Sequence, residues 1–321
     1  MNAGQPSRTA IGAAGYRAAH QVLEDGGVFS DPLARTILGP GCDAIVAALS
    51  SDAAQKPARI FMAARSRFAE DCLQAAVSRG VRQAVVLGAG LDTFSLRNPY
   101  AEAGLRVFEV DHPATQAWKL ERLAEVGLTP PASTVFAGVD FETQSLGDTL
   151  VAAGIEWERS TFFFWLGVVP YLRREAIMAT LRFIASLPGA EVVFDYSEPL
   201  GNFPPGRRAE MQDLAARAAA IGEPWMSHFD PTDLSALLRN YGFEGIEDLG
   251  LADIAARYPG AAEIPIDAGP GPHVIRAVAR RAVSDSEIGR SALQRRMATD
   301  VRSWRIRALA WLGVSRSRSR P

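Results

Sequence analysis

Residues 85–93 read Val85-Val86-Leu87-Gly88-Ala89-Gly90-Leu91-Asp92-Thr93. The apolar opening is typical of a buried strand, and the Gly-x-Gly that follows is typical of a tight turn at the carboxyl end of such a strand. A Cβ at Gly88 or Gly90 would block the turn and hold the backbone away from an adenosine-containing ligand. The segment therefore predicts an open α/β sheet that binds its ligand at this edge.

Short β-rich runs alternate with helical stretches from Gln83 to Arg280, the pattern of βαβ units on a largely parallel sheet. Five runs are expected to be parallel strands separated by crossover helices, and they cover residues 84–87, 105–110, 133–137, 161–165 and 191–196. Two more runs, 245–249 and 273–278, follow an amphipathic helix that begins after Asp230-Pro231-Thr232. We expect them to extend one edge, which gives an α/β fold with seven mostly parallel strands.

The rest of the chain divides into a cap, an insertion and a tail. Residues 1–80 contain no convincing strand and are expected to form a helical cap, whereas residues 81–281 form the α/β domain. A polar insertion at about 198–228 lies where it can close over a ligand. The tail, 282–321, has nine arginines and three acidic residues, so nine minus three leaves a charge of +6. Such a tail either contacts nucleic acid or anionic lipid or is solvated, and the solvated tail is the commoner case.

Composition narrows the class of protein. The 321 residues are 48% hydrophobic and 22% charged, a balance that excludes a mainly disordered chain. The net charge of -2 gives no field that attracts nucleic acid or a membrane, so we expect neither as a partner. Two cysteines and four histidines are too few for a disulfide framework or a zinc site, so no metal is predicted, and Cys42 and Cys72 are expected to be buried thiols. Without a recognisable signal peptide or long apolar run, the expected location is cytoplasmic.

An acidic pair closes the second strand, in Glu109-Val110-Asp111. Glu109 stands nineteen residues after Gly90 (109 minus 90), where a carboxylate can accept hydrogen bonds from ribose hydroxyls, and spacing alone leaves Glu109 and Asp111 both open. Thr93 replaces the third glycine that lets a helix pack close to a pyrophosphate. S-adenosylmethionine needs the turn and the ribose acid but has no phosphate, so this pattern favours it over a nicotinamide dinucleotide.

Arg65 lies in the apolar stripe of a helix predicted over 59–79. The stripe consists of Phe61, Ala64, Phe68, Cys72 and Ala76. At ~100° per residue, Arg65 points between Cys72 and Ala76 and so toward the core. A buried guanidinium needs an anion, which is either a ligand carboxylate or an internal partner. The internal candidates are Glu109, Asp111 and Asp140.

Two further segments follow strands at the same edge. Asp140 comes after the third strand, where it either accepts the adenine amino group, with Phe141 beside the ring, or caps the next helix. The fourth strand leads into residues 165–172, in which Gly167 permits a close approach of the backbone. Tyr171 is either a wall of the pocket or an ordinary core aromatic.

These segments together resemble the leucine carboxyl methyltransferase-like family, in particular its bacterial branch of S-adenosylmethionine-dependent methyltransferases, which includes polyketide O-methyltransferases. The match covers most of residues 8–280. The residues that carry it are Arg65-Ser66-Arg67-Phe68, 87–93, Phe108-Glu109-Val110-Asp111-His112-Pro113 with Lys119, 165–168 with 171–172, and Phe194-Asp195-Tyr196.

The resemblance implies a class I methyltransferase fold, which is Rossmann-like, and S-adenosylmethionine as the cofactor. The cofactor-binding residues that it implies are Arg65 for the carboxylate, Gly88 and Gly90 for the methionine portion, Asp111 for the ribose, and Asp140 with Phe141 for the adenine. It thus favours Asp111 over Glu109. Eukaryotic members have a glutamate near the end of the fourth strand where this chain has Leu166, so that contact does not carry over.

The predicted function is O-methylation of a small-molecule carboxylate or hydroxyl. A carboxylate is ionised at neutral pH and needs no base, whereas a hydroxyl is helped by one. Candidate bases are His112, Tyr171, Tyr196 and His228, although each lone histidine is more often a hydrogen-bonded packing residue. The alternatives are a nicotinamide-dependent oxidoreductase that uses the same turn, and a catalytically silent module that binds the cofactor.

Overall fold

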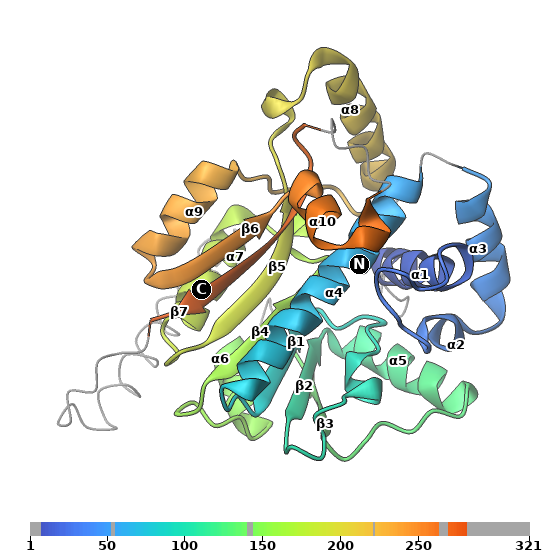
Figure 1. The fold of residues 1–321 in the computed structure, drawn as a ribbon. Helices are drawn as coiled ribbons and strands as arrows, with labels where there is room; N and C mark the ends of the chain where they lie inside the picture. The colour runs from blue at the N-terminus through green and yellow to red at the C-terminus, as the bar shows by residue number, and fades with distance from the viewer. Residues whose placement is uncertain (1–7, 53–54, 140–143, 221, 263–268, 281–321) are drawn as a thin grey trace, which may run out of the picture.

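A seven-stranded sheet forms the centre of the protein in the computed structural model, which describes residues 8–52, 55–139, 144–220, 222–262 and 269–280 (Figure 1). The strands are β1 (Gln83–Leu87), β2 (Arg106–Asp111), β3 (Thr134–Gly138), β4 (Thr161–Trp165), β5 (Glu191–Ser197), β6 (Phe243–Leu249) and β7 (Pro272–Ala279). Each begins and ends within two residues of its predicted bounds. The short β-rich runs between helical stretches therefore located every predicted strand.

The order of the strands is β3-β2-β1-β4-β5-β7-β6. Strands β1 to β5 are parallel, and β7 is antiparallel to both β5 and β6. This agrees with the predicted α/β fold of seven mostly parallel strands. The order reverses between β1 and β4, and in an open α/β sheet the crevice beyond the carboxyl ends of such neighbours is where ligands bind.

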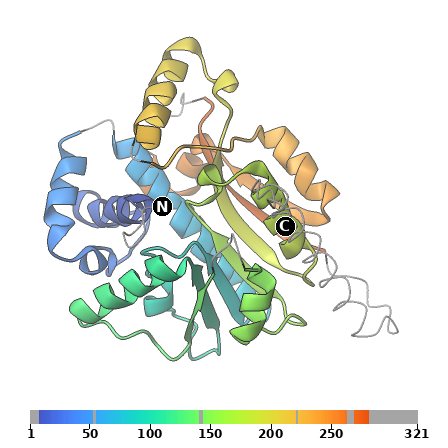
Figure 2. The same cartoon turned by 180° about the vertical axis from the view of Figure 1, so that it is seen from behind.

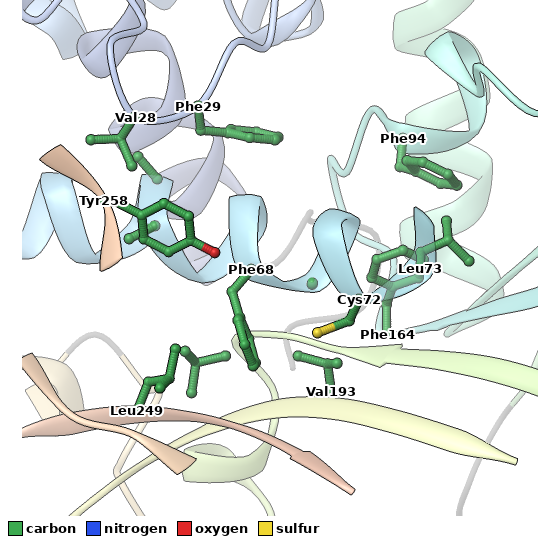
Figure 3. Packing of buried hydrophobic residues seen from close by; sticks show 14 of the residues in the cluster. Val28, Phe29, Phe68, Cys72, Leu73, Phe94, Phe164, Val193, Leu249 and Tyr258 are labelled. Atoms are coloured by element: carbon green, nitrogen blue, oxygen red, sulfur yellow. The ribbon is translucent and has the colours of Figure 1, made fainter. Parts of the chain in front are cut away.

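Helices cover both faces of the sheet. The α-helices after residue 55 are α4 (Lys56–Ser78), α5 (Pro113–Glu125), α6 (Leu146–Ala152), α7 (Arg174–Ala185), α8 (Pro205–Ala220), α9 (Pro231–Asn240) and α10 (Leu251–Arg257). On one face α4 packs Phe68, Cys72 and Leu73 against residues of the sheet such as Val193 (Figure 3). Helices α6, α7 and α9 pack on the other face, which Figure 2 shows from behind.

The connection between β1 and β2 differs from the expected crossover helix. It contains the 3₁₀ helix η3 (Phe94–Arg97) and no α-helix among the described residues 88–105. Its side chains are engaged elsewhere, since Thr93 donates to Asp31 over 2.7 Å and the Arg97 guanidinium holds both carboxylate oxygens of Glu70 on α4. These hydrogen bonds to Asp31 and to α4 hold Thr93 and Arg97 in positions that a regular α-helix over the segment would not allow.

Three helices form a cluster of their own beside the sheet, namely α1 (Arg8–Leu23), α2 (Ala34–Leu38) and α3 (Cys42–Ser50). They pack on Leu91, which follows the glycine turn, and on Leu123 of α5. The helix α4 instead belongs to the core of the sheet, and α8 stands out from the molecule with no buried residue (Figure 1). The division at residue 80 stays a prediction, and the basic tail lies outside the described residues.

Both cysteines are buried and unbridged, as predicted, and burial raises the pKa of the Cys72 thiol to about 12. Within the ranges that the structure describes, His, Cys, Asp and Glu side chains form no group of three that could hold a metal ion. Over the same ranges, no helix has the length and apolarity that crossing a membrane requires.

Candidate functional site

The glycine turn leaves β1 at its carboxyl end. Gly88 and Gly90 have φ values of 67° and 44°, in the left-handed region that glycine adopts without strain. A Cβ at Gly88 would come within 2.5 Å of the Val168 side chain, and one at Gly90 within 2.9 Å of the Cβ of Ala10 on α1. Both positions therefore require glycine, because the loop after β4 and the cap approach the turn closely.

Helix α1 is tied to the end of this turn. The Arg17 guanidinium donates to the Leu91 carbonyl over 2.7 Å and pairs with Asp31 over 3.0 Å, and both side chains are buried. A pyrophosphate site would need the amino end of an α-helix after the turn, and η3 does not supply one. The structure thus supports the argument from Thr93 against a nicotinamide dinucleotide.

Asp111 lies against the turn. Its carboxylate accepts the Gly90 N–H over 2.6 Å and the His112 N–H over 2.7 Å. Burial raises the pKa of Asp111, although these two donors favour the ionised form. A carboxylate at the end of β2, beside the second glycine, can accept hydrogen bonds from the hydroxyls of a ribose lying over the turn.

Glu109 has a different environment from that of Asp111. It is buried and pairs with the Lys119 ammonium over 2.6 Å, and it also accepts the Ser95 hydroxyl. The same ammonium donates to the Asp92 carbonyl over 2.7 Å. Glu109 therefore holds Lys119 under the segment that follows the turn.

Arg65 is buried, as its place in the stripe of α4 predicts, with 6% of its surface exposed. Its Nη1 donates to Asp195 Oδ2 on β5 over 2.5 Å. The internal partner is thus Asp195, and the expectation of Glu109 or Asp111 was wrong, because α4 crosses β4, β5 and β7. Asp140, the third expected partner, lies outside the described residues, as does Phe141.

Gly167 completes this group of residues. Its N–H donates to Asp195 Oδ1 over 2.5 Å, its φ is 71°, and a Cβ there would lie 3.0 Å from Nη2 of Arg65. The neighbouring residue is Val168, whose side chain lies beside Gly88. One cation, one carboxylate and a stretch of bare backbone therefore meet at the ends of β4 and β5, next to the glycine turn.

The four candidate bases lie in different environments. His112 caps α5, because its Nδ1 accepts the Ala114 N–H over 3.1 Å, and His228 Nδ1 pairs with the Ser197 hydroxyl over 3.1 Å. Burial lowers the pKa of His228. Tyr196 is buried and donates to Asp248 over 2.5 Å, and burial raises its pKa. Tyr171 is half-buried in the 3₁₀ helix η4 (Val169–Tyr171).

The cap and the insertion meet near this edge. Glu223, which follows α8, accepts the Thr9 N–H over 3.0 Å and also the Thr9 hydroxyl. Further along, the Met226 N–H donates to the Pro170 carbonyl over 2.7 Å. The segment after α8 therefore touches both the first turn of α1 and the loop after β4.

Sequence reasoning gave no role to Asp195. It stands in an otherwise apolar part of β5, and the signal that could have found it is an acidic side chain at a buried strand position.

A separate open depression of about 380 Å³ is lined by residues of α9, β6 and β7, among them Arg239, Asp248 and His273. None of the residues predicted to bind the cofactor lines that depression, so we place the candidate site at the glycine turn.

Comparisons with known proteins show the family of the chain. Residues 10–185 match the family described as leucine carboxyl methyltransferase. A protein of Bacillus subtilis (strain 168) is 38% identical over 193 residues, which cover 60% of this chain and 63% of that protein. One of Mycobacterium avium (strain 104) is 31% identical over 277 residues, which cover 78% of this chain and 87% of that protein. Both are named as candidate S-adenosyl-L-methionine-dependent methyltransferases, and the chain spans less than two thirds of the first.

Solved structures support the fold. A candidate methyltransferase of Thermobifida fusca aligns with a TM-score of 0.53 at 17% identity, over 88% of this chain and 97% of that one. A DUF574 family protein of Streptomyces avermitilis aligns with the same score and identity, over 83% and 97%. The expected class I methyltransferase fold is thereby confirmed. The chain belongs to the leucine carboxyl methyltransferase family, as its motifs predict.

Proposed function

We propose that this protein transfers the methyl group of S-adenosylmethionine to a carboxylate or hydroxyl oxygen of a small molecule. The observation that carries the proposal is the convergence of the glycine turn, Asp111 and Arg65 at one edge of the sheet. Asp111 of β2 lies against Gly90 and Arg65 of α4 lies against Gly167, beside backbone that has no side chain at Gly88, Gly90 and Gly167.

The residues at this edge fit the parts of the cofactor. Arg65 Nε is buried and has no hydrogen-bond partner among the described residues, so the guanidinium retains a donor for a carboxylate. Asp111 offers acceptors for the ribose hydroxyls, and Gly88 and Gly90 admit the methionine portion close to the backbone. Asp140 and Phe141 remain our assignment for the adenine.

The bound cofactor supplies an electrophilic methyl group on a sulfonium. The protein's task is to hold the acceptor in line with that methyl group and to exclude water. Helix α1 and the segment around Glu223 border the edge and are placed to enclose it. A carboxylate acceptor, with a reference pKa of ~4, arrives ionised and needs no base.

A hydroxyl acceptor would use a base. His228 suits this role, since burial lowers its pKa and so keeps the imidazole neutral at neutral pH. Tyr171 is the second candidate because it follows the loop that carries Gly167. We do not retain Tyr196, since its hydroxyl donates to Asp248. Nor do we retain His112, because its Nδ1 accepts a backbone N–H and the neutral ring then carries its proton on Nε2.

Measuring the binding of S-adenosylhomocysteine to variants tests the proposed cofactor site directly. Calorimetry with S-adenosylhomocysteine is expected to show that Arg65→Ala and Asp111→Ala bind at least ~10-fold more weakly, since a hydrogen bond to a charged group contributes ~1.5–3 kcal/mol. Arg67→Ala is the matched control, because Arg67 lies on the same helix but pairs at the surface with Asp71. Normal binding by both Arg65→Ala and Asp111→Ala would remove the site assignment.

Transfer tests the reaction. The native protein, given methyl-labelled cofactor and a cell extract, is expected to place label on a small molecule, and Arg65→Ala to place far less. Alkali releases methanol from a methyl ester and not from a methyl ether, so this treatment separates a carboxylate acceptor from a hydroxyl. Binding of the cofactor without any labelled product would instead identify a silent binding module.

A further inference from the structure

Both carboxylate oxygens of Asp195 accept hydrogen bonds inside the protein. Its side chain is 7% exposed, Oδ2 accepts from Arg65 Nη1, and Oδ1 accepts the Gly167 N–H, each over 2.5 Å. Both are charge-assisted hydrogen bonds, the stronger kind. The carboxylate therefore fixes α4 and the loop after β4 relative to each other.

Among the described residues, the hydrogen bond found for the Arg65 guanidinium is the one from Nη1 to Asp195. Guanidinium carries five N–H donors in a planar fork, and Nε together with one hydrogen of Nη2 forms the edge away from Nη1. In the described part of the chain Nε has no partner although it is buried, and Nη2 lies against the bare backbone of Gly167. The Nε–Nη2 edge is one of the two edges of a guanidinium that can bind a carboxylate through two parallel hydrogen bonds.

The net charge of the Arg65–Asp195 pair also suits the amino-acid end of the cofactor. A lone buried guanidinium would be costly, whereas Arg65 with Asp195 is a neutral ion pair. The amino-acid end of the cofactor is also neutral overall, because it carries one ammonium and one carboxylate. A neutral pair whose Nε has no partner among the described residues can accept this zwitterion without a net charge being buried.

We infer that Asp195 is a positioning residue of the cofactor site, which holds Arg65 so that its Nε–Nη2 edge faces the amino-acid end of the cofactor. The inference rests on the proposed function. Asp195 acts through Arg65, so its loss is expected to affect only ligands that have an amino-acid end.

Two ligands separate positioning from a merely structural role. S-adenosylhomocysteine has the amino-acid end, and 5′-methylthioadenosine shares its adenosine and thioether but lacks that end. For Asp195→Asn, calorimetry is expected to show S-adenosylhomocysteine binding weakened about 10-fold or more, and 5′-methylthioadenosine binding unchanged within about twofold.

The same strand offers a matched control. Glu191 lies on the same face of β5, four residues or ~13 Å away, and is also buried in ion pairs, with Arg276 over 2.7 Å and with Arg79. Glu191→Gln removes an equivalent buried charge, yet the ratio of the two affinities is expected to stay native. Asp195→Glu keeps the charge, so it protects the fold while moving the guanidinium, and it is expected to change the ratio in the same direction as Asp195→Asn.

The outcomes are distinguishable. If Asp195→Asn and Asp195→Glu lose affinity for both ligands in proportion, or bind S-adenosylhomocysteine as tightly as the native protein, the positioning role is overturned and the proposed function stands. If the native protein binds neither ligand, the proposed function falls and the inference falls with it.

Discussion

Glu109 and Asp111 show how two carboxylates on one strand acquire different roles. Residues two apart on a strand share a face, and Glu109 lies ~6.6 Å deeper along β2 than Asp111. At that depth Lys119 and Ser95 enclose it, whereas Asp111 reaches the Gly90 N–H at the end of the strand. Spacing along the sequence could not separate them, because the difference is depth beneath the edge.

His273 allows a pH prediction for a single residue. Its Nδ1 lies 3.1 Å from Asp248 Oδ1, and its Nε2 lies 3.1 Å from Glu198 Oε1. Its ring stacks on that of Tyr196. Burial by itself lowers the pKa of His273, but the hydrogen bonds and charges of the two carboxylates outweigh it, so the pKa is raised above the ordinary 6.5. A raised native pKa stabilises the fold at pH values below 6.5, and this contribution is lost as pH rises through the native pKa.

We therefore expect the stability advantage of the native protein over His273→Gln to be largest near pH 6 and to shrink toward pH 9. At an unfolding entropy of ~2.1 cal/mol/K per residue, a change of ~1 kcal/mol corresponds to ~1–2 °C in Tm for a chain of 321 residues. Thermal melts of both proteins across this range measure the difference. An advantage that grows with pH would contradict a charged His273 in the native state.

The sequence predicts the burial of Arg65 but not the partner of its ion pair. Its inward direction follows from helical periodicity, because the apolar stripe of α4 is regular. Its partner could not be predicted, because Asp195 lies 130 residues away and is brought to α4 only by the assembly of the sheet. Sequence-based reasoning therefore predicted the residue's burial but not its ion pair.

Helix α1 is the element that contacts both sides of the candidate site. Ala10 lies next to Gly90, and Thr9 bonds to Glu223 beyond α8. Carboxylates are favourable at the amino end of a helix, because unpaired N–H groups and the helix dipole meet there. The Glu223 side chain thus stabilises the first turn of α1 from a distant segment.

We expect Glu223→Ala to raise amide hydrogen exchange in the first turn of α1 by on the order of tenfold, since the loss of such a cap costs ~1 kcal/mol or more. Glu210→Ala on exposed α8 serves as the control, because Glu210 pairs with Arg207 at the surface. Exchange that is equal in both variants would show that Glu223 does not hold α1.

Among the elements, strands and the long helix were predicted best. Helix α4 was expected over 59–79 and spans Lys56–Ser78, because its stripe repeats over many turns. The helix expected between β1 and β2 was wrong, since contacts of Thr93 and Arg97 with distant residues decide that segment. Such long-range ties leave no periodic signal in the sequence.

At the scale of the whole molecule, the seven strands and their mostly parallel arrangement were predictable, but their order was not. Strand β7 lies between β5 and β6, and Glu191 on β5 pairs with Arg276 on β7 across that junction. Both of the last two runs carry the same short β pattern, so the pattern cannot say which one joins β5. The edge of the sheet that binds the ligand was predictable, because it depends only on where parallel strands end.

The central claim is that the cofactor lies across the carboxyl ends of β1, β2 and β4 with its amino-acid end at Arg65. A crystal structure of the native protein with S-adenosylhomocysteine tests it most directly. We predict that the ligand carboxylate lies within hydrogen-bond distance of the Arg65 guanidinium, that the ribose hydroxyls lie beside Asp111, and that the Arg65–Asp195 pair is retained. A ligand bound elsewhere, or one at this edge whose carboxylate faces solvent while Arg65 contacts only Asp195, would contradict the account.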